Sequence, residues 1–174
     1  MDPASLALAC ASIAGLTKAA NKMTKTMVKV YRDKDGIRSD IHASIGRLRT
    51  TKDTIDLAME SLSDAIREDP ESKVIKYLED KLVLAGIGEE AKFLSKTMLG
   101  ITRQITSTRI FREVYWVWKL KKKVDALIPF SSNVHLLLLS AANSILLERS
   151  KAGAPPSEAS WKKRADAIFP QWTA

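Results

Sequence analysis

The chain contains a single cysteine, Cys10, so no disulfide can form within it. A lone cysteine is typical of proteins in a reducing compartment, and we expect the resting protein to be cytoplasmic. Glycine and proline are scarce, with seven and six among 174 residues, and β-branched residues do not alternate with polar ones as they do in strands. These absences argue against a disulfide framework and a β-fold, and they favour an all-helical protein.

Groups that carry catalysis or bind metals are also few. The two histidines, His42 and His135, have no cysteine or second histidine at the spacing of metal ligands. The glycines are scattered and form no phosphate-binding loop after a strand. Carboxylate pairs such as Glu89 and Glu90 fall on polar faces or at helix ends, where solvation explains them. We therefore expect no enzyme activity, no cofactor and no metal.

Apolar residues at three- and four-residue spacing predict long helices with short connections. The first helix should begin at Asp2, as a cap, with Pro3 in its first turn, and should end at Asp33-Lys34-Asp35-Gly36. A second series from Ile41 to Ile66 predicts another long helix. It should end at Asp69-Pro70, a pair that would also cap and begin the third helix.

The remaining apolar series predict three more segments. The third helix should reach about residue 105, with a kink or break where its phase slips at Gly86 and Gly88. Residues 109–128 should form a helix closed by Pro129, and Ser131 to Asn133 should cap a last helix over 134–149. The sequence therefore predicts an antiparallel bundle of four to five helices over residues 1–150. Residues 151–174 would be a linker or a short peripheral amphipathic helix.

The first predicted helix has two unlike ends. Residues 3–17 are uncharged, and fifteen residues are too few to span a bilayer core, which takes ~20. Small residues recur at every fourth position and would let another backbone approach closely, either in a bundle or in lipid: Ala7, Ala11, Gly15 and Ala19. The second half carries a row of cations, here called the basic ladder: Lys18, Lys22, Lys25, Lys29 and Arg32.

A second basic segment lies at residues 109–128, where four lysines stand beside aromatic residues. Aromatic rings beside lysines suit a membrane interface, but they are equally typical of a helix that packs on a protein core. We expect most of the rings to face the bundle core: Phe111, Tyr115, Trp116 and Trp118. If the segment meets lipid, the contacts would be Lys119, Lys121, Lys122 and Lys123.

The formal net charge is +8, and most of the surplus lies in segments 1–36 and 109–128. Such clustering favours an anionic partner, either lipid or nucleic acid, although a basic helix face is often only a solvated one. Nucleic-acid binding would depend on charge alone, because no recognition helix or base-stacking pattern is present. We expect anionic membrane lipid as partner and no specific nucleic acid.

Three stretches taken together resemble the HeLo-like N-terminal domain of fungal STAND (NOD-like receptor) proteins. They are the opening MDPASLALACASIAGLTKAANKMTK, the stretch VYRDKDGIRSDIHASIGRLRTTKDTIDLAMESL and the late segment KLKKKVDALIPFSSNVHLLLLSAANS. The resemblance spans roughly residues 1–150. It implies a helical bundle that acts in programmed cell death, heterokaryon incompatibility or innate immunity, with its N-terminal helix, here Pro3 to Arg32, as the membrane-acting element.

The resemblance also implies that a nucleotide-binding or repeat domain follows in the parent protein and that clustering activates the bundle. We expect a cell-death effector that self-associates and moves from the cytoplasm to the plasma membrane. The alternative is a non-lytic signalling adaptor whose helices bind partner helices. The adaptor needs the small-residue stripe but not the basic ladder.

Overall fold

The computed structural model describes residues 3–32, 37–107 and 112–150. The expectations for Asp2, for Asp33 to Gly36, for Phe111 and for residues 151–174 lie outside these residues. Every regular element in the described part is helical, which confirms the predicted all-α bundle. In chain order the elements are α1 (Pro3–Tyr31), α2 (Ser39–Glu68), α3 (Lys73–Asp80), α4 (Val83–Ser107), α5 (Arg112–Tyr115), a π-helical turn (Trp116–Leu120) and α6 (Lys121–Ser150).

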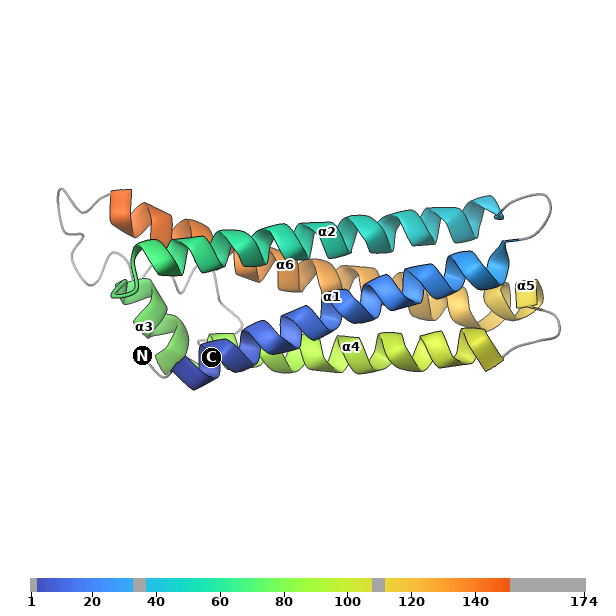
Figure 1. Ribbon diagram of the computed structural model, residues 1–174, viewed down its shortest axis with the longest axis horizontal. Coiled ribbons are helices and arrows are strands. Elements are labelled where there is room, and N and C mark those ends of the chain that lie inside the picture. The colour runs from blue at the N-terminus through green and yellow to red at the C-terminus, as the bar shows by residue number, and fades with distance from the viewer. Residues whose placement is uncertain (1–2, 33–36, 108–111, 151–174) are drawn as a thin grey trace.

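Four long helices lie along one another, and the short α3 lies at one end (Figure 1). Helices α1 and α4 run in one direction, and α2 and α6 run in the other. The most extensive packing joins the parallel partners, α1 with α4 and α2 with α6, while smaller antiparallel contacts join α1 with α2 and α4 with α6. Each long helix therefore has one parallel and one antiparallel neighbour.

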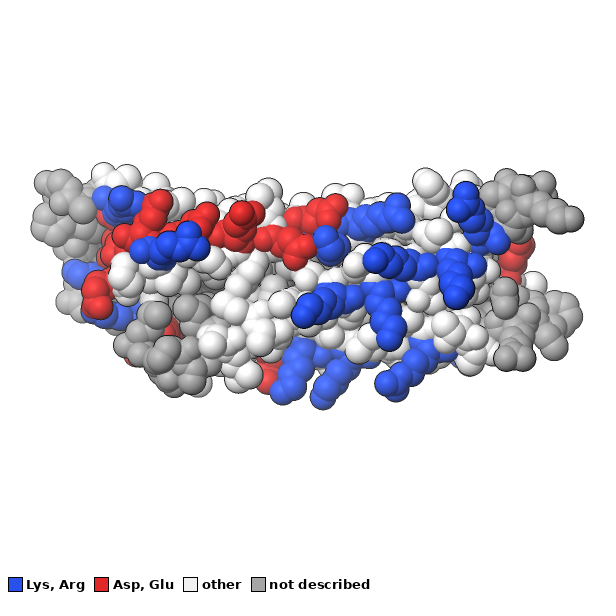
Figure 2. Space-filling model, viewed as in Figure 1, with Lys and Arg blue, Asp and Glu red and all other residues white. Residues whose placement is uncertain are grey.

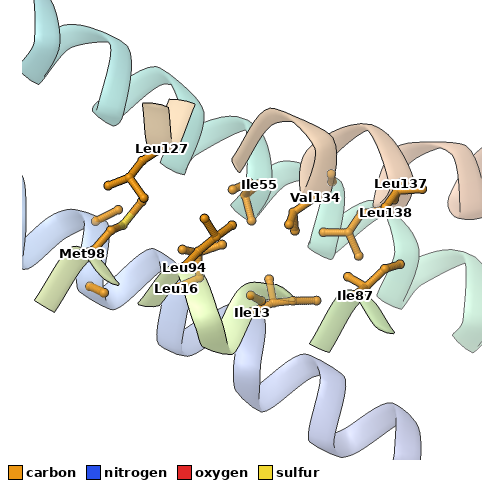
Figure 3. Packing of buried hydrophobic residues seen from close by; sticks show 14 of the residues in the cluster. Ile13, Leu16, Ile55, Ile87, Leu94, Met98, Leu127, Val134, Leu137 and Leu138 are labelled. Atoms are coloured by element: carbon orange, nitrogen blue, oxygen red, sulfur yellow. The ribbon is translucent and has the colours of Figure 1, made fainter. Parts of the chain in front are cut away.

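The core is built from one apolar stripe of each long helix (Figure 3). Ile13 and Leu16 of α1 lie opposite Ile87 and Leu94 of α4, and side chains of α2 and α6 complete the layer. Met23 and Met27 continue the buried stripe of α1 and are fully shielded from solvent. Burial of each such side chain stabilises the fold by ~1.5–3 kcal/mol, so α1 is an integral part of the core.

Helices α1 and α4 approach each other closely at Gly88. A Cβ placed on Gly88 would lie 3.1 Å from the Cα of Ala9, closer than most side-chain contacts allow. Glycine at position 88 and alanine at position 9 therefore let the two parallel helices pack tightly.

The break between α3 and α4 lies at Lys81 and Leu82, so the prediction that the helix breaks at Gly86 and Gly88 is wrong. Leu82 has a φ of 55°, and its amide donates to the carbonyl of Glu79, which ends α3. The amide of Gly86 donates to the carbonyl of Leu82, so Gly86 already lies in the first turns of α4.

The N-terminal cap of α3 is Ser72, and the prediction that Asp69 and Pro70 begin this helix is wrong. The hydroxyl of Ser72 accepts a hydrogen bond of 3.1 Å from the amide of Val74. Glu148 at the end of α6 accepts bonds of 3.2 Å from the amides of Lys73 and Val74, and it also accepts from the Ser72 hydroxyl. A carboxylate from a distant helix thus satisfies the first amides of α3.

Pro129 lies inside α6, so the predictions that it closes one helix and that Ser131 to Asn133 cap the next are wrong. Proline in a helix interior costs ~3 kcal/mol because it removes one hydrogen bond and crowds the preceding turn. Leu127 and Val134, on either side of it, are both buried in the core, and this packing keeps the helix continuous.

The combined helix Glu113–Ser150 is long and apolar enough to cross a membrane by length and composition alone. Of its most apolar stretch, 39% is buried inside the bundle, and core helices pass the same test. This property alone does not assign the helix to a membrane.

Candidate functional site: the cationic face of helix α1

Four members of the basic ladder, from Lys18 to Lys29, lie on the solvent-exposed side of α1, and the fifth, Arg32, is exposed directly after the helix ends at Tyr31. The opposite side holds Leu16, Met23 and Met27, which are buried against the other helices. Because these apolar residues follow the helical repeat, they fix the rotation of α1 and turn the lysines outward. The spacing read from the sequence was therefore sufficient to predict which residues are exposed.

None of the ladder residues has an ion-pair or hydrogen-bonded side-chain partner among the described residues. Figure 2 shows that Lys and Arg gather over one half of this face, across α1 and the neighbouring helices. Exposed residues that the sequence reasoning missed are Arg49 of α2 and Lys96 and Arg103 of α4. On α4, Lys96 follows Lys92 by four residues and Arg103 follows Lys96 by seven. This helical spacing could have indicated that the α4 cations share one side of the helix.

The other half of the face carries an acidic row on α2, formed by Asp53, Asp56, Glu60, Asp64 and Glu68 (Figure 2). This row is largely neutralised within the molecule. The Lys52 ammonium nitrogen lies 3.0 Å from a carboxylate oxygen of Asp53 and 2.9 Å from one of Asp56. Arg67 forms an ion pair with Asp64, and Arg149 forms one with Glu68. The ladder residues, together with Arg49, Lys96 and Arg103, have no such acidic partner among the described residues, so their charge is available to an external anion.

The predicted small-residue stripe divides between two environments. Ala7 and Ala11 are exposed, Gly15 is half-buried and Ala19 is buried. The hydroxyl of Ser95 on α4 donates to the Gly15 carbonyl over 3.3 Å. The second half of the stripe therefore faces α4, and only Ala7 and Ala11 are open to another molecule.

In the second group of predicted lipid contacts, Lys119 lies in the π-helical turn and the other three lysines lie in the first turn of α6. Lys119, Lys122 and Lys123 are exposed, and Lys121 is half-buried. The ammonium of Lys119 lies 5.8 Å from the centre of the Tyr115 ring, a cation–π distance. Helices α1 and α6 are not among the well-packed helix pairs, so the three lysines of α6 are not packed beside the ladder lysines of α1.

The aromatic residues of the same segment also divide. Trp118 is 82% exposed, so the expectation that it faces the core is wrong, whereas Trp116 is fully buried and Tyr115 half-buried. The extra residue of the π-helical turn changes which side chains face inward. Trp116 lies edge-on to Tyr31, with ring centroids 5.5 Å apart.

The Trp116 indole reaches the first turn of α2. Its Nε1 donates a hydrogen bond of 3.2 Å to Oδ2 of Asp40. The guanidinium Nε of Arg38 lies 3.2 Å from Oδ1 of the same carboxylate and forms an ion pair with it. Although partial burial alone would raise the pKa of Asp40, the Arg38 charge and the indole hydrogen bond outweigh it and hold this pKa below its ordinary value. Tyr31, Asp40 and Trp116 thus form a junction between the end of α1, the start of α2 and the π-helical turn. No spacing of residues in the sequence indicated this contact.

No group of three or more His, Cys, Asp or Glu residues that could hold a metal ion occurs within residues 3–32, 37–107 and 112–150. Cys10 on α1 is half-buried, and burial raises the pKa of its thiol.

Comparison with known proteins gave no match: no family model, no curated protein and no solved structure matches the chain. Function is therefore inferred from the surface of the molecule and from the resemblance seen in the sequence.

Proposed function

We propose that the protein is a membrane-targeting cell-death effector of the HeLo-like type. It docks on the anionic inner face of the plasma membrane through the basic ladder and self-associates there. The observation that carries the proposal is the exposed ladder of five cations, four on α1 and Arg32 directly after it, none of which has an acidic partner among the described residues. The sequence resemblance supplies the cell-death role and the downstream receptor domains.

The charge of the ladder is sufficient for docking. A basic residue near an anionic leaflet contributes ~1 kcal/mol, so the five together contribute ~5 kcal/mol at most. Figure 2 shows further Lys and Arg side chains on the helices beside α1, and Lys96 and Arg103 are exposed cations of the neighbouring α4. A folded bundle can therefore be held at the membrane without inserting an apolar segment.

The same magnitudes indicate that α1 stays in the bundle when it first docks. Withdrawal of α1 would expose Ile13, Leu16, Met23 and Met27, at a cost of roughly 6–12 kcal/mol in apolar burial alone. That cost exceeds the electrostatic gain. Release of α1 thus requires a further contribution, which self-association on the membrane would provide through exposed small residues such as Ala7 and Ala11.

Charge reversal of the ladder tests the proposal. Replacement of all five cations by Glu should abolish binding to vesicles that contain phosphatidylserine, and unchanged binding would contradict the proposed contact. A matched pair refines the result: K25E/K29E should weaken binding strongly, whereas K76E/K81E, which reverses two exposed lysines at the α3 end, should weaken it little.

Forced oligomerisation separates the effector from the adaptor. The chain fused to a trimeric coiled coil should release dye from anionic vesicles, and the five-residue reversal in the same fusion should not. If the fusion binds partner helices but leaves vesicles intact, the adaptor role replaces the effector role. Strong salt-dependent binding to duplex DNA, without lipid binding, would instead indicate a nucleic-acid partner.

A further inference from the structure

An apolar groove of about 480 Å³ lies between α4 and α6. Its α4 wall includes Phe93, Thr97 and Gly100, and its α6 wall includes Leu127 and Phe130. Phe93 is 67% exposed and Phe130 54% exposed, although both are large apolar side chains. The volume falls within the ~300–1,000 Å³ range of small-molecule sites.

One end of the groove is cationic. Lys123 and Gln104 both line it, and the Lys123 ammonium donates to the Gln104 side-chain carbonyl over 3.1 Å. The nearest carboxylate in sequence, Asp125, pairs with Arg47 at 2.9 Å. Lys123 has a neutral amide as its partner and no acidic partner among the described residues, so its positive charge is not compensated there.

The polar and apolar ends are well separated. Phe93 and Gln104 are eleven residues apart on α4, which corresponds to ~16 Å along a helix. Because α6 runs antiparallel to α4, Phe130 lies toward the Phe93 end and Lys123 toward the Gln104 end. The groove thus combines a long apolar floor with a single cation at one end.

We infer that this groove binds one acyl chain of an anionic membrane phospholipid, with the phosphate of that lipid at Lys123. An acyl chain matches the long apolar floor, and an anionic headgroup matches the lysine. The inference depends on the proposed function only for the source of the lipid, since the groove and the basic ladder are different surfaces.

Binding is tested in solution with a monomeric lipid as probe, lauroyl lysophosphatidylglycerol below its critical micelle concentration. Calorimetric titration of the full chain should show saturable binding of one molecule per chain. Lauroyl lysophosphatidylcholine, whose headgroup has no net charge, should bind at least fivefold more weakly. Lack of saturable binding of the anionic probe would overturn the inference.

Two glycines provide a matched pair of variants. A Cβ on Gly100 or on Gly46 would meet no other atom within 4 Å, so both positions accept a side chain without a clash at Cβ. Gly100→Trp places an indole in the groove and should weaken binding at least tenfold. Gly46→Trp, on the exposed surface of α2, should leave binding unchanged. Equal affinity of the two variants for the probe would overturn the inference.

The charge at the end of the groove is tested separately. Lys123→Gln should remove most of the preference for the anionic over the neutral probe, while Lys122→Gln, an exposed neighbour that does not line the groove, should keep it. Retention of the full preference in Lys123→Gln would overturn the headgroup assignment.

The groove and the proposed function can fail independently. The five-residue ladder reversal should still bind the monomeric probe with wild-type affinity, since the groove is intact, and loss of probe binding in that variant would contradict a separate site. Wild-type protein that binds the probe but no anionic vesicles would support the groove and remove the proposed function.

Discussion

The indole nitrogen of Trp116 donates a hydrogen bond to the carboxylate of Asp40, which joins the π-helical turn to the start of α2. Tyr31, at the end of α1, packs edge-on against the same indole. The three residues thus hold together the end of α1, the beginning of α2 and the turn that leads into α6. Asp40 is the charged member, so the stability of the junction should depend on pH.

We expect Asp40→Asn to destabilise the protein by about 1 kcal/mol at neutral pH, because it removes the charge that faces Arg38 but keeps an acceptor for the indole. The pKa of Asp40 is lowered in the folded state, so its contribution is fully present above the unfolded pKa of ~3.9 and is lost as the pH falls through the folded value. Urea unfolding from pH 7 to pH 2 should show the two proteins converging in acid. A constant difference in unfolding free energy would contradict this origin.

Gly88→Ala should lower stability, although alanine favours a helix by ~1 kcal/mol over glycine. The new methyl group would lie 3.1 Å from the Cα of Ala9, and a backbone atom cannot move aside as a flexible side chain does. Overpacking of this kind costs ~1–3 kcal/mol, so the net loss should reach up to ~2 kcal/mol. Gly100→Ala, where the Cβ has open space, is the control and should gain ~0.5–1 kcal/mol in the same unfolding experiment. If Gly88→Ala stabilises as much as the control, the helices are not in close contact there.

Glu148→Gln should loosen α3 without unfolding the rest of the bundle. The two carboxylate oxygens accept separately from the amides of Lys73 and Val74. Glutamine keeps one of these acceptors and places an NH2 group against the other amide, so we expect part of the ~0.5–2 kcal/mol contribution of a helix cap to be lost. Hydrogen exchange should therefore quicken in α3, while amides in the middle of α4 keep their protection. Glu89→Gln, an exposed position on α4, is the control and should change neither region. Unchanged exchange in α3 would mean that Ser72 alone is a sufficient cap.

Cys10 can report whether α1 leaves the bundle. Because burial raises the pKa of its thiol, the thiolate fraction at neutral pH is below that of an exposed cysteine, and iodoacetamide should react slowly and faster as the pH rises. Docking of the monomer on anionic vesicles should leave this rate almost unchanged, and forced oligomerisation there should increase it several-fold. Mass spectrometry of the labelled chain measures both rates. A jump in rate on docking of the monomer would show that α1 is released without self-association.

The elements that the sequence predicted well are those whose boundaries have local causes. Pro3 begins α1, and the outward side of α1 follows from the apolar spacing around Met23 and Met27. The predictions failed where tertiary packing outweighs local preference. Pro129 stays within a helix because residues on both sides of it are buried, and Leu82 adopts a left-handed conformation that no residue type at that position indicates.

The candidate surfaces were predictable to different degrees. The basic ladder lies in α1 and the residue that follows it, so its exposure could be predicted from the helical spacing alone. The α4–α6 groove could not, because Phe93 and Phe130 come from helices that meet only in the folded bundle. The close approach of α1 to α4 occurs at Ala9 and Gly88, beside the predicted stripe of small residues, because the rotation of α1 is set by its larger side chains.

The division of charge gives the face shown in Figure 2 an electric dipole directed along the length of the bundle. An anionic sheet would exert a torque on this dipole and turn the cationic half downward before any atoms touch. At physiological ionic strength the field decays over ~8 Å, so this rotation is confined to the last moments of an encounter. Productive collisions should therefore become rarer as salt is added, even under conditions where the lifetime of the docked state changes little.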